Sequence, residues 1–208
     1  MGFITRQKSP GYRLNVAPKH VRLLQVIRAQ EQIRKLMKKF MSELSFFWGV
    51  TGVIFILSKA VLKLTPYVSN LLDYEFNTYH WLVLVLFTIF MGYAEGYKGF
   101  QKKLSPRVIS RAIYLKNNPS TLRFVLAPFF CVGYFWSTKK RLITSYSVTA
   151  FIALLIIVVK QVPQPWRGII DLGVIVGLSW GIIAIIYFLC LYLRKQEFSY
   201  PPETPDQP

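Results

Sequence analysis

The sequence contains few acidic residues, few histidines and few cysteines. Only nine of its 208 residues are Asp or Glu, and it has two Cys and two His. Cys131 and Cys190 both lie within apolar segments, which is typical of small buried hydrophobic residues rather than of a disulfide or a pair of metal ligands. His20 and His80 are far apart in the sequence, so no cluster of His and Cys predicts a metal site. We therefore expect neither a disulfide nor a bound metal.

Motifs of common enzyme classes are absent as well. There is no HExxH zinc motif, no GxSxG nucleophile motif, no Walker loop and no GxGxxG dinucleotide motif. No pair of acidic residues has a spacing typical of metal-assisted catalysis. The sequence therefore predicts a protein that is not an enzyme and that binds no cofactor.

Apolar residues, in contrast, are abundant and clustered. Charged residues make up 17% of the chain, whereas a soluble domain has about 25%. The apolar residues form blocks of about 20 residues, the length that crosses a hydrocarbon core about 30 Å thick. Four blocks are predicted to cross the membrane, at residues 44–62, 79–97, 142–159 and 169–193. The expected fold class is an all-α, polytopic membrane helix bundle with four transmembrane helices.

A further apolar stretch, residues 124–136, is too short to cross. A helix over its 13 residues would be about 20 Å long. Pro128 and Gly133 interrupt it, and basic residues flank both ends. We expect a re-entrant or interfacial segment that returns to the side it left. A crossing at this point would give the alternative, a protein with five spans.

The chain is strongly basic, with a formal net charge of +17. In a soluble protein this charge would suggest a nucleic-acid partner. Here the basic residues flank the apolar blocks, as the positive-inside rule describes, so no nucleic acid is expected. If residues 124–136 do not cross, 22 of the 26 Lys and Arg fall on one side. This split predicts that both termini are cytoplasmic, in a bacterial inner membrane or, as the alternative, in an organellar inner membrane.

Residues 20–43 have the periodicity of an amphipathic helix, with apolar residues on one face and basic residues on the other. Such a helix usually lies on an anionic membrane surface, and we expect its lipid contacts at Arg28, Lys35, Lys38 and Lys39. The alternative is a docking helix for a protein partner. The expected organisation is a basic tail and surface helix at 1–43, the bundle at 44–195 and a disordered Pro-rich tail at 196–208.

Small residues recur at helical spacing in two of the predicted spans. Gly92 and Gly96 form a GxxxG pattern, and Gly173, Gly177 and Gly181 repeat the same spacing. Small residues let transmembrane helices approach closely. We expect close contact between the second and the last span. Self-association through the Gly173 stripe, giving a homodimer, is the competing use of the pattern.

Glu95 is a carboxylate near the end of the second span, on the same side of the helix as Thr88 and Gly92. One interpretation is an ion pair with Lys98 or Lys102 at the membrane edge. The other is an intramembrane carboxylate that, with Thr88, binds a proton, a cation or a substrate amine. The first interpretation needs no function, and the second predicts a polar or ion site.

Two classes of function follow from this reading. The first is a small transporter or a transport accessory subunit with Glu95 as its intramembrane carboxylate. The second is a non-catalytic membrane scaffold or assembly factor, whose basic segments bind anionic lipid and partner subunits. No polar stripe runs through a whole span, which argues against a self-sufficient transporter.

Overall fold

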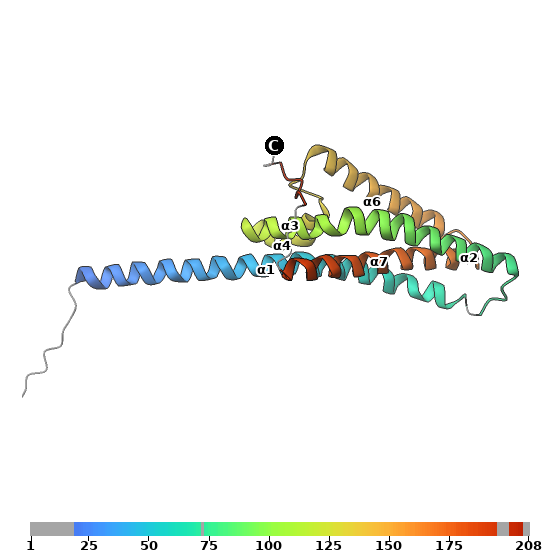
Figure 1. Ribbon diagram of the computed structural model, residues 1–208, viewed down its shortest axis with the longest axis horizontal. Coiled ribbons are helices and arrows are strands. Elements are labelled where there is room, and N and C mark those ends of the chain that lie inside the picture. The colour runs from blue at the N-terminus through green and yellow to red at the C-terminus, as the bar shows by residue number, and fades with distance from the viewer. Residues whose placement is uncertain (1–18, 72, 195–199, 206–208) are drawn as a thin grey trace, which may run out of the picture. The chain divides into compact units, whose positions relative to one another are not determined.

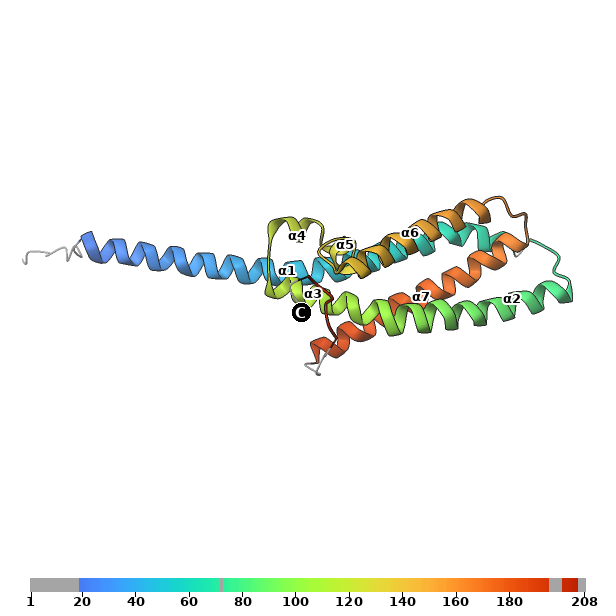
Figure 2. The same ribbon diagram turned by 90° about the horizontal axis from the view of Figure 1, so that it is seen from above.

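The structure, a computed structural model, describes residues 19–71, 73–194 and 200–205. Its contacts divide the chain into two units, residues 1–39 and residues 40–208, which are described separately. The regular structure in the described ranges is entirely helical. Figures 1 and 2 show the elements along the chain in two views.

The described part of the first unit is the beginning of helix α1 (Lys19–Ser69). Every residue from 23 to 39 is exposed. The exposed side chains include both apolar residues, such as Leu23 and Ile33, and basic residues, such as Lys35 and Lys38. Among residues 23–39, no side-chain packing therefore accounts for the apolar residues.

Four helical segments are long and apolar enough to cross a membrane. They belong to α1, to a second rod that spans Thr78–Asn117, to α6 (Lys139–Val159) and to α7 (Trp166–Leu193). In both views α2 and α7 lie side by side (Figures 1 and 2). The predicted fold class, an all-α bundle with four transmembrane helices, is confirmed.

Helix α1 is longer than the first predicted span, which ends at residue 62. It continues through Pro66 to Ser69. Proline removes one main-chain N–H and usually ends a helix. Here the hydroxyl groups of Thr65 and Ser69 donate to the carbonyls of Val61 and Pro66, at 2.9 Å in each case. These bonds add contacts within the helix on either side of the proline but do not replace the bond that Pro66 removes, whose acceptor would be the Leu62 carbonyl.

The second rod consists of α2 (Thr78–Met91), the π-helix η1 (Gly92–Leu104) and α3 (Ser105–Asn117). Its start is fixed by a capping box. The Asn77 side chain accepts a hydrogen bond from the main-chain N–H of His80, and the His80 side chain accepts one from the main-chain N–H of Asn77. The α-helix α3 begins at Ser105 with Pro106 in its first turn, and because Ser105 has helical φ and ψ of −60° and −49°, α3 continues the rod rather than starting a separate helix.

Pro106 gives a physical reason for the π-helix. Its ring cannot donate to the preceding turn and would clash with the carbonyl of Lys102 in a regular α-helix. A wider turn before the proline relieves that clash without breaking the rod. The end of the rod agrees with the sequence pattern, because α3 stops at Asn117, directly before "NPS".

The short apolar stretch 124–136 forms no span. It contains the end of α4 (Thr121–Val125) and all of α5 (Ala127–Val132), and neither helix is among those long enough to cross. Gly133 follows with φ of 99°, a left-handed conformation that favours glycine and reverses the chain. The chain then enters α6.

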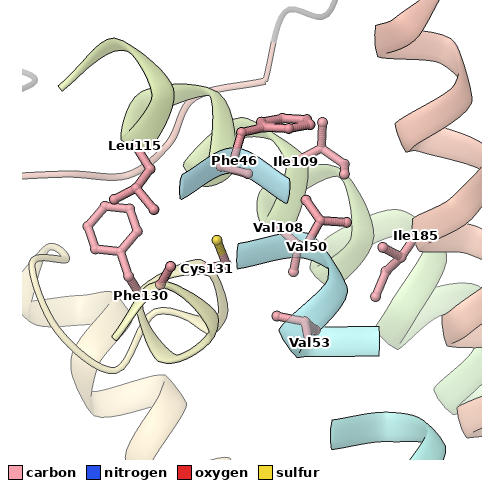
Figure 3. Close-up of a cluster of buried hydrophobic side chains, with 11 residues drawn as sticks. Phe46, Val50, Val53, Val108, Ile109, Leu115, Phe130, Cys131 and Ile185 are labelled. Atoms are coloured by element: carbon pink, nitrogen blue, oxygen red, sulfur yellow. The ribbon is translucent and has the colours of Figure 1, made fainter. Parts of the chain in front are cut away.

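The buried core lies where α1, α3, α5 and α7 meet (Figure 3). Gly49 lets the helices approach here, because a Cβ on it would lie 2.8 Å from the sulfur of Cys131. Helix α6 is different, since most of its apolar residues are exposed. The core residues are Phe46, Val50, Val53, Val108, Ile109, Ala112, Leu115, Ala127, Phe130, Cys131 and Ile185.

Candidate functional site

The predicted site residues meet at the contact between η1 and α7, which we call the η1–α7 seam. Its members are Glu95, Gly96 and Phe100 on η1, and Gly177, Trp180 and Gly181 on α7. The glycines of α7 do not face glycines of the second span, as a stripe-on-stripe contact would require. Each faces a larger side chain, because a Cβ on Gly173 would lie 2.7 Å from the Phe87 ring and one on Gly181 2.5 Å from the Phe100 ring.

The reciprocal contact is made by Gly96, which is buried. A Cβ on it would lie 2.9 Å from the ring of Trp180, and the Trp180 indole N–H donates to the Gln101 side-chain oxygen at 2.8 Å. Gly92 is less crowded, since the nearest atom to a Cβ there, on Val176, is 3.6 Å away. Side chains of the same chain, Phe87, Glu95 and Phe100, therefore cover the glycines of α7. A homodimer that used this stripe would have to displace them.

Glu95 lies directly over Gly177. A Cβ on Gly177 would be 3.1 Å from Oε2 and 3.2 Å from the Cβ of Glu95. The absence of a side chain on α7 at this point leaves the space that the glutamate fills. Glu95 is half-buried as a result.

Neither of the lysines considered as partners pairs with Glu95 in the described ranges. Lys98 lies over the ring of Tyr93, 4.8 Å from its centroid, and Lys102 lies over Tyr97 at 4.7 Å. Both ammonium groups thus contact aromatic rings rather than the Glu95 carboxylate. The carboxylate of Glu95 therefore faces the seam without a basic partner among the described residues.

Thr88 lies on α2, seven residues before Glu95, which is about 10 Å along a helix. Its hydroxyl oxygen is buried and has no hydrogen-bond partner among the described residues. The structure does not bring this hydroxyl into contact with the Glu95 carboxylate. Thr88 and Glu95 thus lie on the same rod, but they are not placed to bind one ion together.

The predicted lipid contacts, Arg28, Lys35, Lys38 and Lys39, all lie in the first unit and are exposed. Each is therefore accessible for contact with a surface or a partner. Their apolar neighbours on the same helix are exposed too, including Val26 and Ile27.

The sequence reading misses a second polar centre, the arginine cluster, formed by Arg107, Arg111, Arg141 and Glu203. Arg111 is fully buried on α3, with the Phe130 ring stacked 4.2 Å from its guanidinium carbon. Its donors all bind main-chain carbonyls: Nε binds Phe130, Nη1 binds Pro202, and Nη2 binds Phe135 and Trp136, at 2.6 to 3.1 Å. One side chain thus connects α3, the turn after α5 and the C-terminal tail.

Arg107 and Arg141 flank this centre and share the carboxylate of Glu203. The Nη2 of Arg107 donates to Oε1 at 3.2 Å, and its Nε lies 3.0 Å from Oε2 without forming a hydrogen bond. The Nε of Arg141 is 3.8 Å from the same Oε2, and its Nη2 donates to the Val132 carbonyl at 3.2 Å. The Thr138 amide donates to the carbonyl of Glu203 at 3.2 Å.

These contacts differ from the disorder that the sequence predicts for residues 196–208. Within that range, residues 200–205 pack on α3 and the start of α6, and Thr204 is fully buried. Residues 196–199 and 206–208 lie outside the described residues. The sequence of α3 could have indicated a buried arginine, because Arg111 lies on the same helical face as the apolar residues Val108, Ala112 and Leu115, all of which are buried.

The cysteines and histidines behave only partly as the sequence predicts. Cys131 is buried, and burial raises the pKa of its thiol to about 12. Cys190 is exposed rather than buried, on the surface of a transmembrane helix. No group of three or more His, Cys, Asp or Glu side chains within the described residues is placed to hold a metal ion. The side chain of His20 lies outside the described part.

Together these features define a membrane-embedded protein with four spanning helices and two polar centres, the η1–α7 seam and the arginine cluster. No known protein family matches the chain, and no match is found among curated proteins or among solved structures.

Proposed function

We propose that the protein is a small membrane transporter or, more specifically, a transport accessory subunit, in which Glu95 binds a proton or a cation. The main support is the half-buried carboxylate in the η1–α7 seam, which has no basic partner among the described residues. An ionisable side chain in a transmembrane bundle is costly, so it is usually retained for a function.

The π-helix supports the same site. Glu95 lies in the first turn of η1, and segments with this wider winding occur frequently at functional sites. Gly177 on α7 leaves room for the carboxylate, because a Cβ there would lie 3.1 Å from its Oε2. A bound proton or cation there would remove the cost of an uncompensated charge.

The accessory role is favoured over independent transport by the surroundings of the seam. The hollow found on α2, lined by Val83, Leu86, Phe87 and Phe90, is apolar. Phe100 and Trp180 cover the glycines next to Glu95. The described surroundings of Glu95 thus consist largely of apolar and aromatic side chains, which favours an accessory role over an independent ion path.

Carbodiimide labelling tests the ionisable site without knowledge of a substrate. Dicyclohexylcarbodiimide modifies protonated carboxyl groups in apolar surroundings, and intact-protein mass measures the adduct. We expect one adduct on the purified protein, absent from Glu95→Gln and reduced by a cation that binds the site. Asp171→Asn is the matched control, because Asp171 is also buried but has Arg167 as a partner at 3.8 Å. Equal labelling of wild type and Glu95→Gln would refute the proposal.

The second candidate is a non-transporting scaffold or assembly factor, favoured by the first unit. Its exposed basic and apolar faces suit an anionic lipid surface or a partner membrane subunit, and a second copy of the chain is a further possible partner. Purification in mild detergent separates the candidates. A stable protein partner favours the scaffold, whereas ion-dependent stability that is lost in Glu95→Gln favours transport.

The proposed location is the inner membrane of a bacterium, with both termini cytoplasmic, and an organellar inner membrane is the alternative. The concentration of basic residues at one end of the spans supports this orientation. The proposal includes no catalytic step and no cofactor.

A further inference from the structure

The arginine cluster holds more positive than negative charge. Arg111 directs its hydrogen bonds to main-chain carbonyls, which leave its charge uncompensated. Arg107 and Arg141, whose side chains are only 11% and 13% exposed, share the single carboxylate of Glu203. Three guanidinium groups thus meet one acid in a largely buried place.

The one acid comes from the tail and not from the helices. Without Glu203, Arg107 and Arg141 would keep no acidic partner among the described residues. Nearly buried charges of the same sign are unfavourable unless an anion pairs with them. The helices alone thus present two nearly buried guanidinium groups that need an anion, and the tail supplies one.

We propose that Arg107 and Arg141 form a binding site for a phosphate group, and that the carboxylate of Glu203 is its intramolecular occupant. This proposal is independent of Glu95 and goes beyond the transport role. Arg107 donates one hydrogen bond to Glu203, from Nη2 to Oε1, while its Nε lies 3.0 Å from Oε2 without forming a hydrogen bond. Arginine pairs carboxylates and phosphates alike through these two nitrogens.

A carboxylate satisfies this site incompletely. The Nε of Arg141 is 3.8 Å from Oε2, too far for a hydrogen bond, and it has no other hydrogen-bond partner among the described residues. The buried Ser145 hydroxyl is also without one, and both groups lie beside Gly133, where a Cβ would be 3.1 Å and 3.4 Å from them. A phosphate group has a third and a fourth oxygen for such donors.

Glu203 is placed so that an external anion can replace it. Its side chain is 31% exposed, so solvent reaches the site from that side. Its φ of 51° is in the left-handed region, which is unfavourable for a residue other than glycine and opposes this position of the tail. A competing phosphate group would release that strain. The group can belong to a lipid head group or to a soluble phosphate.

The test uses the full-length protein in uncharged detergent and compares wild type, Glu203→Gln and the double variant Glu203→Gln with Arg107→Gln. The probes are inorganic phosphate, with chloride at matched ionic strength, and short-chain phosphatidic acid. At about 100 times the dissociation constant, binding should raise the midpoint of thermal unfolding of Glu203→Gln by roughly 5–10 °C. Wild type should respond less, and the double variant should not respond.

Each outcome decides the proposal. A response of Glu203→Gln to phosphatidic acid alone assigns the site to a lipid head group, and a response to inorganic phosphate assigns it to a soluble ligand. Equal responses in wild type and Glu203→Gln, or in Glu203→Gln and the double variant, would overturn it. If Glu203→Gln does not fold, Glu203→Asp replaces it. The shorter side chain keeps the charge but weakens the contact with Arg107 and Arg141. Its midpoint of thermal unfolding must then rise more with the phosphate probes than that of wild type.

Discussion

Arg111 shows how one residue can organise a region of the fold. Its guanidinium is fully buried, yet all its recorded partners are neutral carbonyls from the turn after α5 and from the tail. The planar group carries five donors on three nitrogens and so reaches four carbonyls that lie in different directions, whereas a lysine ammonium has three donors on a single nitrogen. The stacked Phe130 ring adds a favourable contact with the cation.

We expect Arg111→Lys to lower the free energy of unfolding by about 2 kcal/mol or more, since a buried carbonyl left without a donor costs about 1–3 kcal/mol. Thermal unfolding in detergent measures the change. Arg34→Lys is the matched control, because the same substitution there affects an exposed side chain and should alter stability by less than about 0.5 kcal/mol. Equal stability of the two variants would contradict the role given to Arg111.

At the scale of elements, the contact of η1 with α7 depends on which glycines face large side chains. A Cβ on Gly181 would overlap the Phe100 ring, whereas one on Gly92 would make an ordinary contact with Val176. Both glycines are inside helices, so alanine itself should favour the helix at either position. The difference between the two positions therefore isolates packing between the helices.

Gly181→Ala should destabilise the bundle by about 1–3 kcal/mol, the usual cost of overpacking. Gly92→Ala should be neutral or stabilise it by up to about 1 kcal/mol, the helix preference of alanine. The midpoints of thermal unfolding of the two variants, measured in the same detergent, provide the comparison. A loss of stability in Gly92→Ala as large as in Gly181→Ala would show that the described seam is incorrect.

The described residues of the first unit expose an apolar face that no packing among them covers, so we expect a membrane surface or a partner to cover it. A peptide of residues 19–43 should bind vesicles that contain anionic lipid more tightly than neutral vesicles, by about 1 kcal/mol per basic residue near the surface. Binding should weaken as salt rises, because salt screens this attraction. Vesicle co-sedimentation measures both effects. Binding that depends on neither lipid charge nor salt would favour protein docking instead.

The sequence predicts the spans because an apolar block about 20 residues long has few alternatives to a membrane helix. It does not predict η1, because the wider winding depends on how Pro106 is accommodated within a packed rod. It also predicts Glu95 as a site residue without revealing that Lys98 and Lys102 contact aromatic rings.

The arginine cluster escapes prediction for a related reason. The partners of Arg111 are main-chain carbonyls, which no spacing of side chains identifies. The composition of the tail, rich in proline and poor in apolar residues, is typical of disorder. Glu203 becomes ordered there because charges far away in the sequence meet it.

At the scale of the second unit, ion pairs connect the ends of α1, α3 and α6 with the C-terminal tail. Groups in direct contact lie on the same side of a membrane. Lys116 pairs with Glu43 at 2.8 Å, which connects the end of α3 to α1. Glu203 connects Arg107 on α3, Arg141 on α6 and the C-terminal tail. A span between α3 and α6 would separate these groups. The contacts therefore support four spans with the start of α6 and the tail on the same side.

The placement of both candidate sites depends on this topology, so reporter fusions test the account most directly. A reporter that is active only in the cytoplasm would be fused after Trp136 and, in a second chain, after Lys195. We expect activity from both fusions, because the 22 basic residues on one side and the contacts of Glu203 require it. Inactivity after both Trp136 and Lys195, the result that a fifth span over residues 124–136 would give, would contradict the four-span account and with it the arginine cluster.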